Sequence, residues 1–257
     1  MNNSYDKLTG RILAAIFAFA LLCLTDVRGD DPDPIDESAS PQEQGRQLSE
    51  IIRSQVPVEN YQTQGTLTIR SNRGQRQSFK IASVVYTSPS LTWTNIFQVA
   101  DLKGRIKSEY LIVRSPKKPN IYFRTIGQVD TDGQTLIERA KDPYIPIGNS
   151  DFMMADMGFE FLFWPNQSVV RQQIRSGRNT YVLESSQEKP DVYSKIVTWV
   201  DKKTLGPMSA RAYDLKGELI KEFSVGGIKE INGEKVVSRF DMENFQTRFF
   251  SRIEFDE

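Results

Sequence analysis

The sequence predicts a mainly β protein with two helices, in which roughly ten or eleven antiparallel strands follow one another as a meander, closed or nearly closed on itself. Three observations support this. From residue 62 onward, apolar and polar residues alternate in short runs, as in strands with one buried face. Turn residues, mainly Gly, Asn, Asp and Pro, separate the runs. Two segments break the alternation, and both favour helix.

Residues 1–29 have the features of a secretory signal. Lys7 and Arg11 precede an unbroken apolar run over 12–24, which is short for a membrane core of ~30 Å but fits a signal-peptide hydrophobic region. We expect cleavage before Asp30 and a soluble, periplasmic product. The alternative is acylation of Cys23, the only cysteine, although Leu22 fits poorly at the preceding position.

Residues 30–41 are acidic, rich in proline and almost without large apolar groups, so we expect a disordered tether. One domain then covers 42–257. A helix over 40–55 opens it, with Ser40 as N-cap, Pro41 in the first turn and Glu43 completing a capping box. The apolar stripe of this predicted lid helix consists of Leu48, Ile51 and Ile52.

The predicted strands follow in order, separated by turn residues at 72–74, 88–90, 102–104, 115–119, 132–133, 176–179, 216–217 and 232–233. They cover residues 66–70, 79–86, 91–100, 106–113, 121–126, 169–174, 180–185, 193–200, 208–213, 218–225 and 245–256.

In the middle of the chain the strand pattern stops at a proline-containing loop, which is followed by a predicted helix over 150–163. Its residues, with three aromatic residues of the sheet, are candidates for the lining of an apolar cavity, because methionine and aromatic side chains repack around ligands of varied shape. The alternative is a helix that only plugs the core. The candidate ligand-binding residues are Phe152, Met153, Met157, Phe161, Trp164, Trp93, Phe97 and Trp199.

The composition removes several kinds of chemistry. The chain has 33 basic and 33 acidic residues and no histidine, which argues against nucleic-acid binding, His-based catalysis and the usual zinc sites. Asp151 and Asp156 could form an acid–base pair, but Asp151 is better explained as the first-turn residue of the central helix. We therefore expect no enzyme activity, no catalytic residues, no metal and no cofactor.

Two segments carry a resemblance to a known family. Residues 148–157 with Phe163-Trp164-Pro165, and residues 193–202 with 212–219, resemble motifs of the outer-membrane lipoprotein-sorting proteins, the LolA/LolB-like family. The resemblance covers about residues 41–257, and Met153 and Met154 depart from its pattern. It implies an unclosed, curved antiparallel half-barrel with the two helices covering its concave face, and a lipid or acyl-chain cavity between them.

The resulting functional prediction is a periplasmic carrier or binding protein for lipoprotein or other acylated cargo, acting without covalent chemistry. Membrane proteins on either side are possible partners, and we expect a monomer. The alternatives are a lipid-sensing regulatory domain and a structural, protein-interaction β-domain. A large apolar cavity would distinguish the first two from the third.

Overall fold

A computed structural model describes residues 35–129, 135–231 and 234–256. The predicted signal segment, Cys23, the start of the predicted tether, and the predicted turns at 132–133 and 232–233 lie outside these ranges. Within them, the elements in chain order are α1 (Pro41–Ser54), β1 (Tyr61–Arg70), β2 (Arg76–Thr87), β3 (Trp93–Ala100), β4 (Ile106–Ser115), β5 (Lys118–Val129), β6 (Thr135–Arg139), the 3-10 turn η2 (Ile147–Asn149), α2 (Met154–Met157), the 3-10 turn η3 (Glu160–Phe163), β7 (Asn166–Arg175), β8 (Arg178–Ser186), β9 (Lys195–Asp201), β10 (Pro207–Tyr213), β11 (Leu219–Val225), β12 (Ile228–Ile231), β13 (Glu234–Val237), β14 (Arg239–Asn244) and β15 (Phe249–Phe255).

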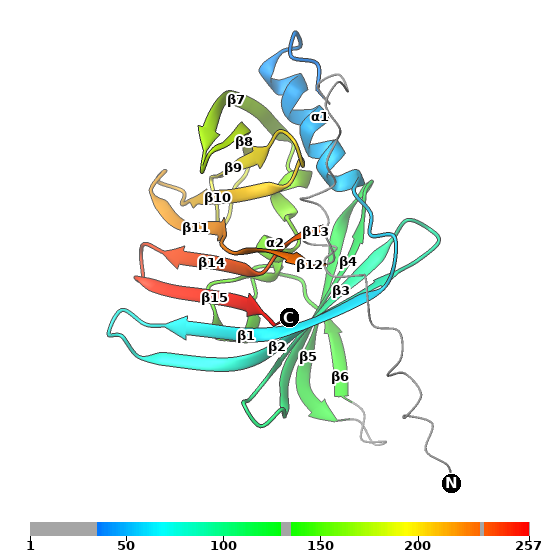
Figure 1. Ribbon diagram of the computed structural model, residues 1–257, viewed down its shortest axis with the longest axis vertical. Helices are drawn as coiled ribbons and strands as arrows, with labels where there is room; N and C mark the ends of the chain where they lie inside the picture. Colours follow the sequence, from blue (N-terminus) through cyan, green and yellow to red (C-terminus); the bar gives the residue numbers. More distant parts are fainter. Residues whose placement is uncertain (1–34, 130–134, 232–233, 257) are drawn as a thin grey trace.

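The architecture confirms the predicted unclosed half-barrel. Thirteen strands form one antiparallel sheet in the order β6-β5-β4-β3-β2-β1-β15-β14-β11-β10-β9-β8-β7, and β12 and β13 form a separate hairpin. The sheet curves around α2 and the turns beside it, with β6 and β7 as unjoined edges (Figure 1). The register pairs Gly65 with Phe255, so β1 and β15 join the two halves of the chain.

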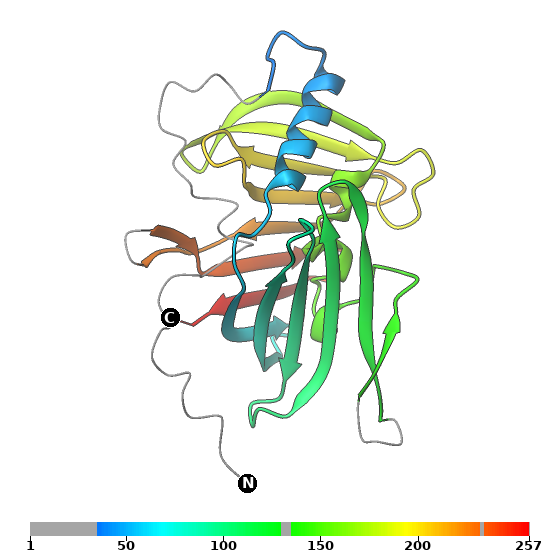
Figure 2. The same ribbon diagram turned by 90° about the vertical axis from the view of Figure 1, so that its right-hand side faces the viewer.

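The predicted N-terminal helix is confirmed and its position is explained by its sequence. The Ser40 side chain accepts a hydrogen bond from the backbone N–H of Glu43 at 3.2 Å. The Glu43 carboxylate, predicted to complete a capping box, instead accepts from Arg46 and Gln47 within the helix. Leu48 and Ile52 are buried and Ile51 partly buried against the sheet, while α1 packs on β7 and η3 (Figure 2).

The predicted tether is too long at its C-terminal end. Residues 35–40 are packed on the domain, because Ile35 is buried in the same cluster as Leu48. Glu37 accepts from Lys202 and Gln172, at 2.8 and 2.9 Å. An apolar side chain, an ion pair and hydrogen bonds from Gln44 and Gln172 therefore attach this stretch, which composition alone predicted to be disordered.

Several strands differ from their prediction. β6, β12, β13 and β14 were missed, and β15 begins at Phe249 rather than Phe245. Asn244 explains the second difference: its side-chain oxygen accepts from the backbone N–H groups of Gln246 and Thr247, and this turns the chain before the last strand.

Candidate functional site

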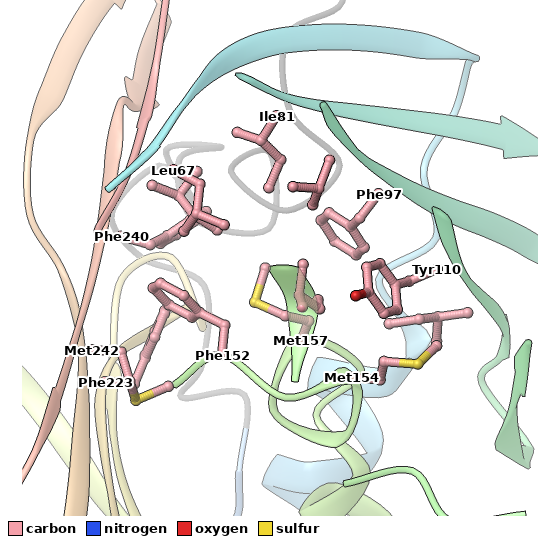
Figure 3. Close-up of a cluster of buried hydrophobic side chains, with 14 of the residues drawn as sticks. Leu67, Ile81, Phe97, Tyr110, Phe152, Met154, Met157, Phe223, Phe240 and Met242 are labelled. Atoms are coloured by element: carbon pink, nitrogen blue, oxygen red, sulfur yellow. The ribbon is translucent and has the colours of Figure 1, made fainter. Parts of the chain in front are cut away.

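Residues 143–164, which we call the central segment, cross the concave face of the half-barrel. The segment is three short turns, not the single helix predicted over 150–163. Met153 is extended, with ψ 156°, and Phe159 adopts a positive φ of 51°, on either side of α2, and a continuous helix cannot pass through such residues. Figure 3 shows Phe152, Met154 and Met157 of this segment among buried side chains of the sheet.

The first polar attachment of the central segment joins Asp156 to Lys221 on β11. Their Oδ2 and Nζ atoms are 2.5 Å apart, and the side chains are only 12% and 4% exposed. The Tyr193 hydroxyl donates to the other Asp156 oxygen at 3.4 Å, and the Lys221 ammonium lies 5.2 Å from the centre of the Tyr193 ring. Asp156 also accepts from the Met153 N–H, which starts α2. This ion pair therefore orders α2 and ties it to the sheet.

The second attachment is made by Asp151. Its carboxylate accepts from Asn244 on β14 at 2.8 Å and from Ser251 on β15 at 3.0 Å, and its backbone N–H donates to the Ser251 hydroxyl. The prediction of Asp151 as a first-turn helix residue is wrong, because α2 begins only at Met154. Asp151 instead anchors the start of the segment across two strands.

The third attachment lies on the opposite side, at Glu160. Its Oε2 accepts from the Tyr122 hydroxyl at 2.7 Å and from Asn120 at 3.2 Å, both on β5. Arg114, buried on β4 between the rings of Trp93 and Phe159, supplies the nearby positive charge. Burial lowers the pKa of Arg114 to about 10, so it remains a cation at neutral pH.

Burial raises the pKa of Glu160 above its ordinary 4.5, and the bonds from Tyr122 and Asn120 and the charge of Arg114 offset this only in part. Because the folded protein then holds this proton more tightly than the unfolded chain, Glu160 adds stability below about pH 4.5 and loses it as the pH rises through the raised pKa. Glu160→Gln keeps an oxygen for both donors but cannot titrate. We expect wild type to gain stability relative to Glu160→Gln on acidification from neutral pH, measured as urea midpoints of the two proteins. Parallel midpoints at every pH would contradict this assignment.

The helix α1 is also fastened to the central segment. The Arg53 guanidinium donates to the Leu162 carbonyl at 2.7 Å and lies 4.8 Å from the centre of the Phe163 ring. The end of the segment is held by Gln167, whose amide donates to the carbonyls of Phe161 and Trp164. The two predicted lid elements therefore form one connected cover.

The structure divides the predicted cavity residues among several clusters. Phe97, Phe152 and Met157 pack together, whereas Phe161 and Trp164 join Leu48 and Ile52 in a second cluster. Trp93 belongs to a third cluster, with Tyr61 and Val85. Met153 is half-buried, with its sulfur 3.6 Å from the Tyr193 hydroxyl.

Trp199 is not brought to the concave face. Along β9, Ile196 and Val200 pack in the cluster with α1, while Val197 and Trp199 pack with Val182 on the other side. Arg175 and Arg211 cover its ring there, at 4.1 and 5.3 Å from the ring centre. The alternation of the strand places it outside the predicted site.

A small cavity lies between the central segment and strands β9–β11. The cavity has a volume of about 30 Å³. One water needs about 10–15 Å³ by this measure, so the cavity has room for a few waters at most and is far too small for an acyl chain. Its lining comprises Asp156, Phe159, Phe161, Ile196, Ala210, Ala212, Lys221, Phe223 and Met242.

Sequence reasoning missed the polar residues of the sheet that hold the cover. The strand pattern did contain a hint. Lys221 lies on the same, inward face of its strand as Phe223, and Arg114 lies on the same face as Ile112 and Tyr110. A charge at an inward position calls for a partner, but the sequence could not say that Asp156 and Glu160 would supply it. Among the described residues, no group of three acidic, histidine or cysteine side chains could hold a metal ion.

Comparisons with known proteins agree with this architecture. A family model described as "Uncharacterized protein" matches residues 138–257. The structure of a DUF1329 family protein from Desulfovibrio piger has a TM-score of 0.68 at 17% identity and covers 85% of this chain and 92% of its own. A putative outer membrane lipoprotein-sorting protein domain from Vibrio parahaemolyticus has the same TM-score at 15% identity, with coverages of 84% and 92%. A LolA superfamily protein from Nitrosomonas europaea reaches 0.58 at 16% identity, with coverages of 85% and 93%.

No curated protein matches the chain. The predicted resemblance to the lipoprotein-sorting proteins is confirmed, and at these identities it concerns the fold. None of the helices in the described ranges is long and apolar enough to cross a membrane.

Proposed function

We propose that the protein is a non-covalent carrier or binding protein for acylated cargo, a lipoprotein or another lipid, and that it works in the periplasm after export. The observation that supports this most is the construction of the concave face. The central segment covers it with Phe and Met side chains, yet its polar ties are confined to a few positions, chiefly Asp151, Asp156 and Glu160.

Moving this cover would expose an apolar trough. Leu67, Ile81 and Phe97 of the sheet, all nearly fully buried, face Phe152 and Met157 of the cover in Figure 3. Each CH₂ of a cargo buried there is worth about 0.8 kcal/mol, so an acyl chain of ordinary length could replace the contacts that the cover gives up. The described conformation is then the closed, cargo-free one, consistent with the small cavity between the central segment and β9–β11.

The acidic groups of the cover have structural partners, which supports binding over catalysis. Asp156 is paired with Lys221, and Asp151 accepts from Asn244 and Ser251. We therefore propose no covalent step and no cofactor. A monomer that exchanges cargo with membrane proteins at either end of its route fits this role.

One observation favours a second candidate, a structural or protein-interaction domain. The cavity of about 30 Å³ is what a permanent plug would leave. In that case Phe152, Met154 and Met157 are ordinary core residues and the cover never opens.

Native mass spectrometry of the purified protein distinguishes the two. A carrier is expected to retain lipid from its host, or to bind a labelled fatty acid after delipidation, and Met153→Glu should abolish this binding while circular dichroism shows the sheet intact. Met153 suits the test because it is a half-buried residue of the cover with its sulfur beside the Tyr193 hydroxyl, so a charge there is added to the cover without filling the tight core. A protein that holds no lipid and takes up no fatty acid would be the plugged domain.

A further inference from the structure

Arg114 is a buried cation without a hydrogen-bonded partner. It is 8% exposed on the inward face of β4, and its guanidinium carbon lies 5.1 Å from the centre of the Trp93 ring and 5.7 Å from that of Phe159. It makes no hydrogen bond and no ion pair to any described residue. Leaving the N–H donors of a buried guanidinium unmatched is costly, so this group is a candidate for binding an anion.

The neighbours of Arg114 on the sheet bring further unmatched polar groups to the same place. Asn95 on β3 lies diagonally across from Arg114 on the same face and is 3% exposed. The side-chain oxygens of Asn95 and of Asn120 on β5 are buried without a hydrogen-bond donor in the ranges that the structure describes. The Asn120 amide also lies 3.1 Å from the Tyr122 hydroxyl. Three adjacent strands thus gather a cation, two amides and a hydroxyl on the concave face.

The cover supplies these groups with one carboxylate oxygen. Glu160 Oε2 accepts from both Tyr122 and Asn120, at 2.7 and 3.2 Å, while the Arg114 guanidinium remains unused. The cover fits closely here, because a Cβ on Gly158 would lie only 2.6 Å from the Tyr122 hydroxyl. We call Arg114, Asn120 and Tyr122 the donor seat. It holds a carboxylate, but it has more donors than that carboxylate satisfies.

We propose that the donor seat binds the anionic headgroup of the cargo, a carboxylate or a phosphate, in place of the Glu160 carboxylate when the central segment moves. This inference rests on the proposed function, because the chain of the same cargo would lie in the trough. The two places are continuous. Arg114, Ile112 and Tyr110 follow one another along the inward face of β4, and Tyr110 is paired with Phe97 of the trough.

The exchange of one anion for another explains why the seat would select against neutral lipids. Burial raises the pKa of the Glu160 carboxyl, so its carboxylate is more stable in water than on the seat. An anionic cargo would replace it and keep a negative charge beside Arg114, whereas a neutral lipid would leave that cation buried without one. Carboxylate and phosphate groups also offer several acceptor oxygens, which match the fork of a guanidinium.

The test compares three probes of the same chain length: hexadecanoic acid, hexadecyl phosphate and hexadecanol. Their binding to the delipidated full chain is measured at neutral pH by displacement of an uncharged apolar dye. We expect the acid or the phosphate to bind at least about tenfold more tightly than the alcohol. The anion that binds better identifies the cargo as a fatty acid or as a lipid with a phosphate headgroup.

Substitutions in the seat should change this preference. Arg114→Met is expected to bring the ratio of anion to alcohol affinity close to one, and Tyr122→Phe to lower it by a smaller factor. The second variant loses only a hydroxyl, so it keeps the test valid if Arg114→Met does not fold. Tyr110→Phe is the matched control. Its hydroxyl also meets the cover, where it accepts from the Gly148 N–H at 3.0 Å, but it lies outside the seat and the ratio should stay as in wild type.

The outcomes separate this inference from the carrier proposal. Equal affinity of the wild type for all three probes would overturn the headgroup seat and leave the carrier proposal standing. A ratio that falls as far in Tyr110→Phe as in Tyr122→Phe would do the same, because the effect would then come from the cover and not from the seat. Uptake of none of the probes would contradict the carrier proposal, and the headgroup seat with it.

Discussion

Replacing Asp156 by alanine is expected to destabilise the protein by about 3–5 kcal/mol, the typical cost of leaving one member of a buried ion pair alone. Lys221 is 4% exposed and would lose its ion-pair partner beside Tyr193 and Phe223, which leaves the Asp151 carbonyl, 3.2 Å away, as its printed acceptor among the described residues. The start of α2 would also lose the bond from the Met153 N–H. The measurement is a shift of the urea midpoint at neutral pH.

The control for this prediction is a double substitution. Asp156→Asn with Lys221→Met removes both charges and keeps side chains of similar volume, so it should return to within about 1–2 kcal/mol of wild type. If the single and double variants were equally unstable, the loss would come from packing around α2 and the ion pair would not be what holds it.

Locking the cover to the sheet is expected to abolish cargo binding. Asp151 and Ser251 touch through two hydrogen bonds of 3.0 Å, so cysteines at these positions, with Cys23 replaced by serine, are placed to form a disulfide between the central segment and β15. If cargo enters beneath the cover, the oxidised protein should show a loss of labelled fatty-acid uptake of at least about tenfold. Reduction should restore it.

A disulfide that does not cross the cover provides the control. Gln98 and Glu109 are opposite each other on β3 and β4 and share a 2.6 Å hydrogen bond. Cysteines there should stiffen the sheet and leave uptake unchanged in either redox state. Uptake that persists in the oxidised Asp151–Ser251 protein would mean that cargo enters by another route.

The predicted elements were those in which local sequence decides the structure. Ser40 and Pro41 fix the start of α1, and alternation identified most of the strands. The missed strands are short or depend on their neighbours: β6 has five residues, and β14 is separated from β15 only by the turn that Asn244 caps. Apolar and polar residues alternate with the same period of two before and after such a turn, so the pattern alone does not show where one strand ends and the next begins.

The sequence predicted where the candidate site lies, but not how its residues are arranged. The apolar composition of 152–164 correctly predicted a cover on the concave face. It did not predict the positive φ of Phe159, which interrupts the helix. Trp199 was predicted to line the cavity as an aromatic residue of the sheet, and it is buried, but on the convex side under Arg175 and Arg211. Which face a residue occupies depends on the register, and one residue of uncertainty reverses it.

The pairing of β1 with β15 also has a kinetic consequence. Among the described strands, it is the only ladder between those that precede the central segment and those that follow it, and it joins Gly65 to Phe255, almost the full length of the domain apart. Closing so long a loop costs conformational entropy before the β1–β15 contacts can form, so the complete sheet should form slowly. It also cannot form until the final strand has been synthesised. Until then β1 and β14 present open edges. A chain interrupted before Phe249 would keep these edges and is the species in which strand-to-strand aggregation should begin.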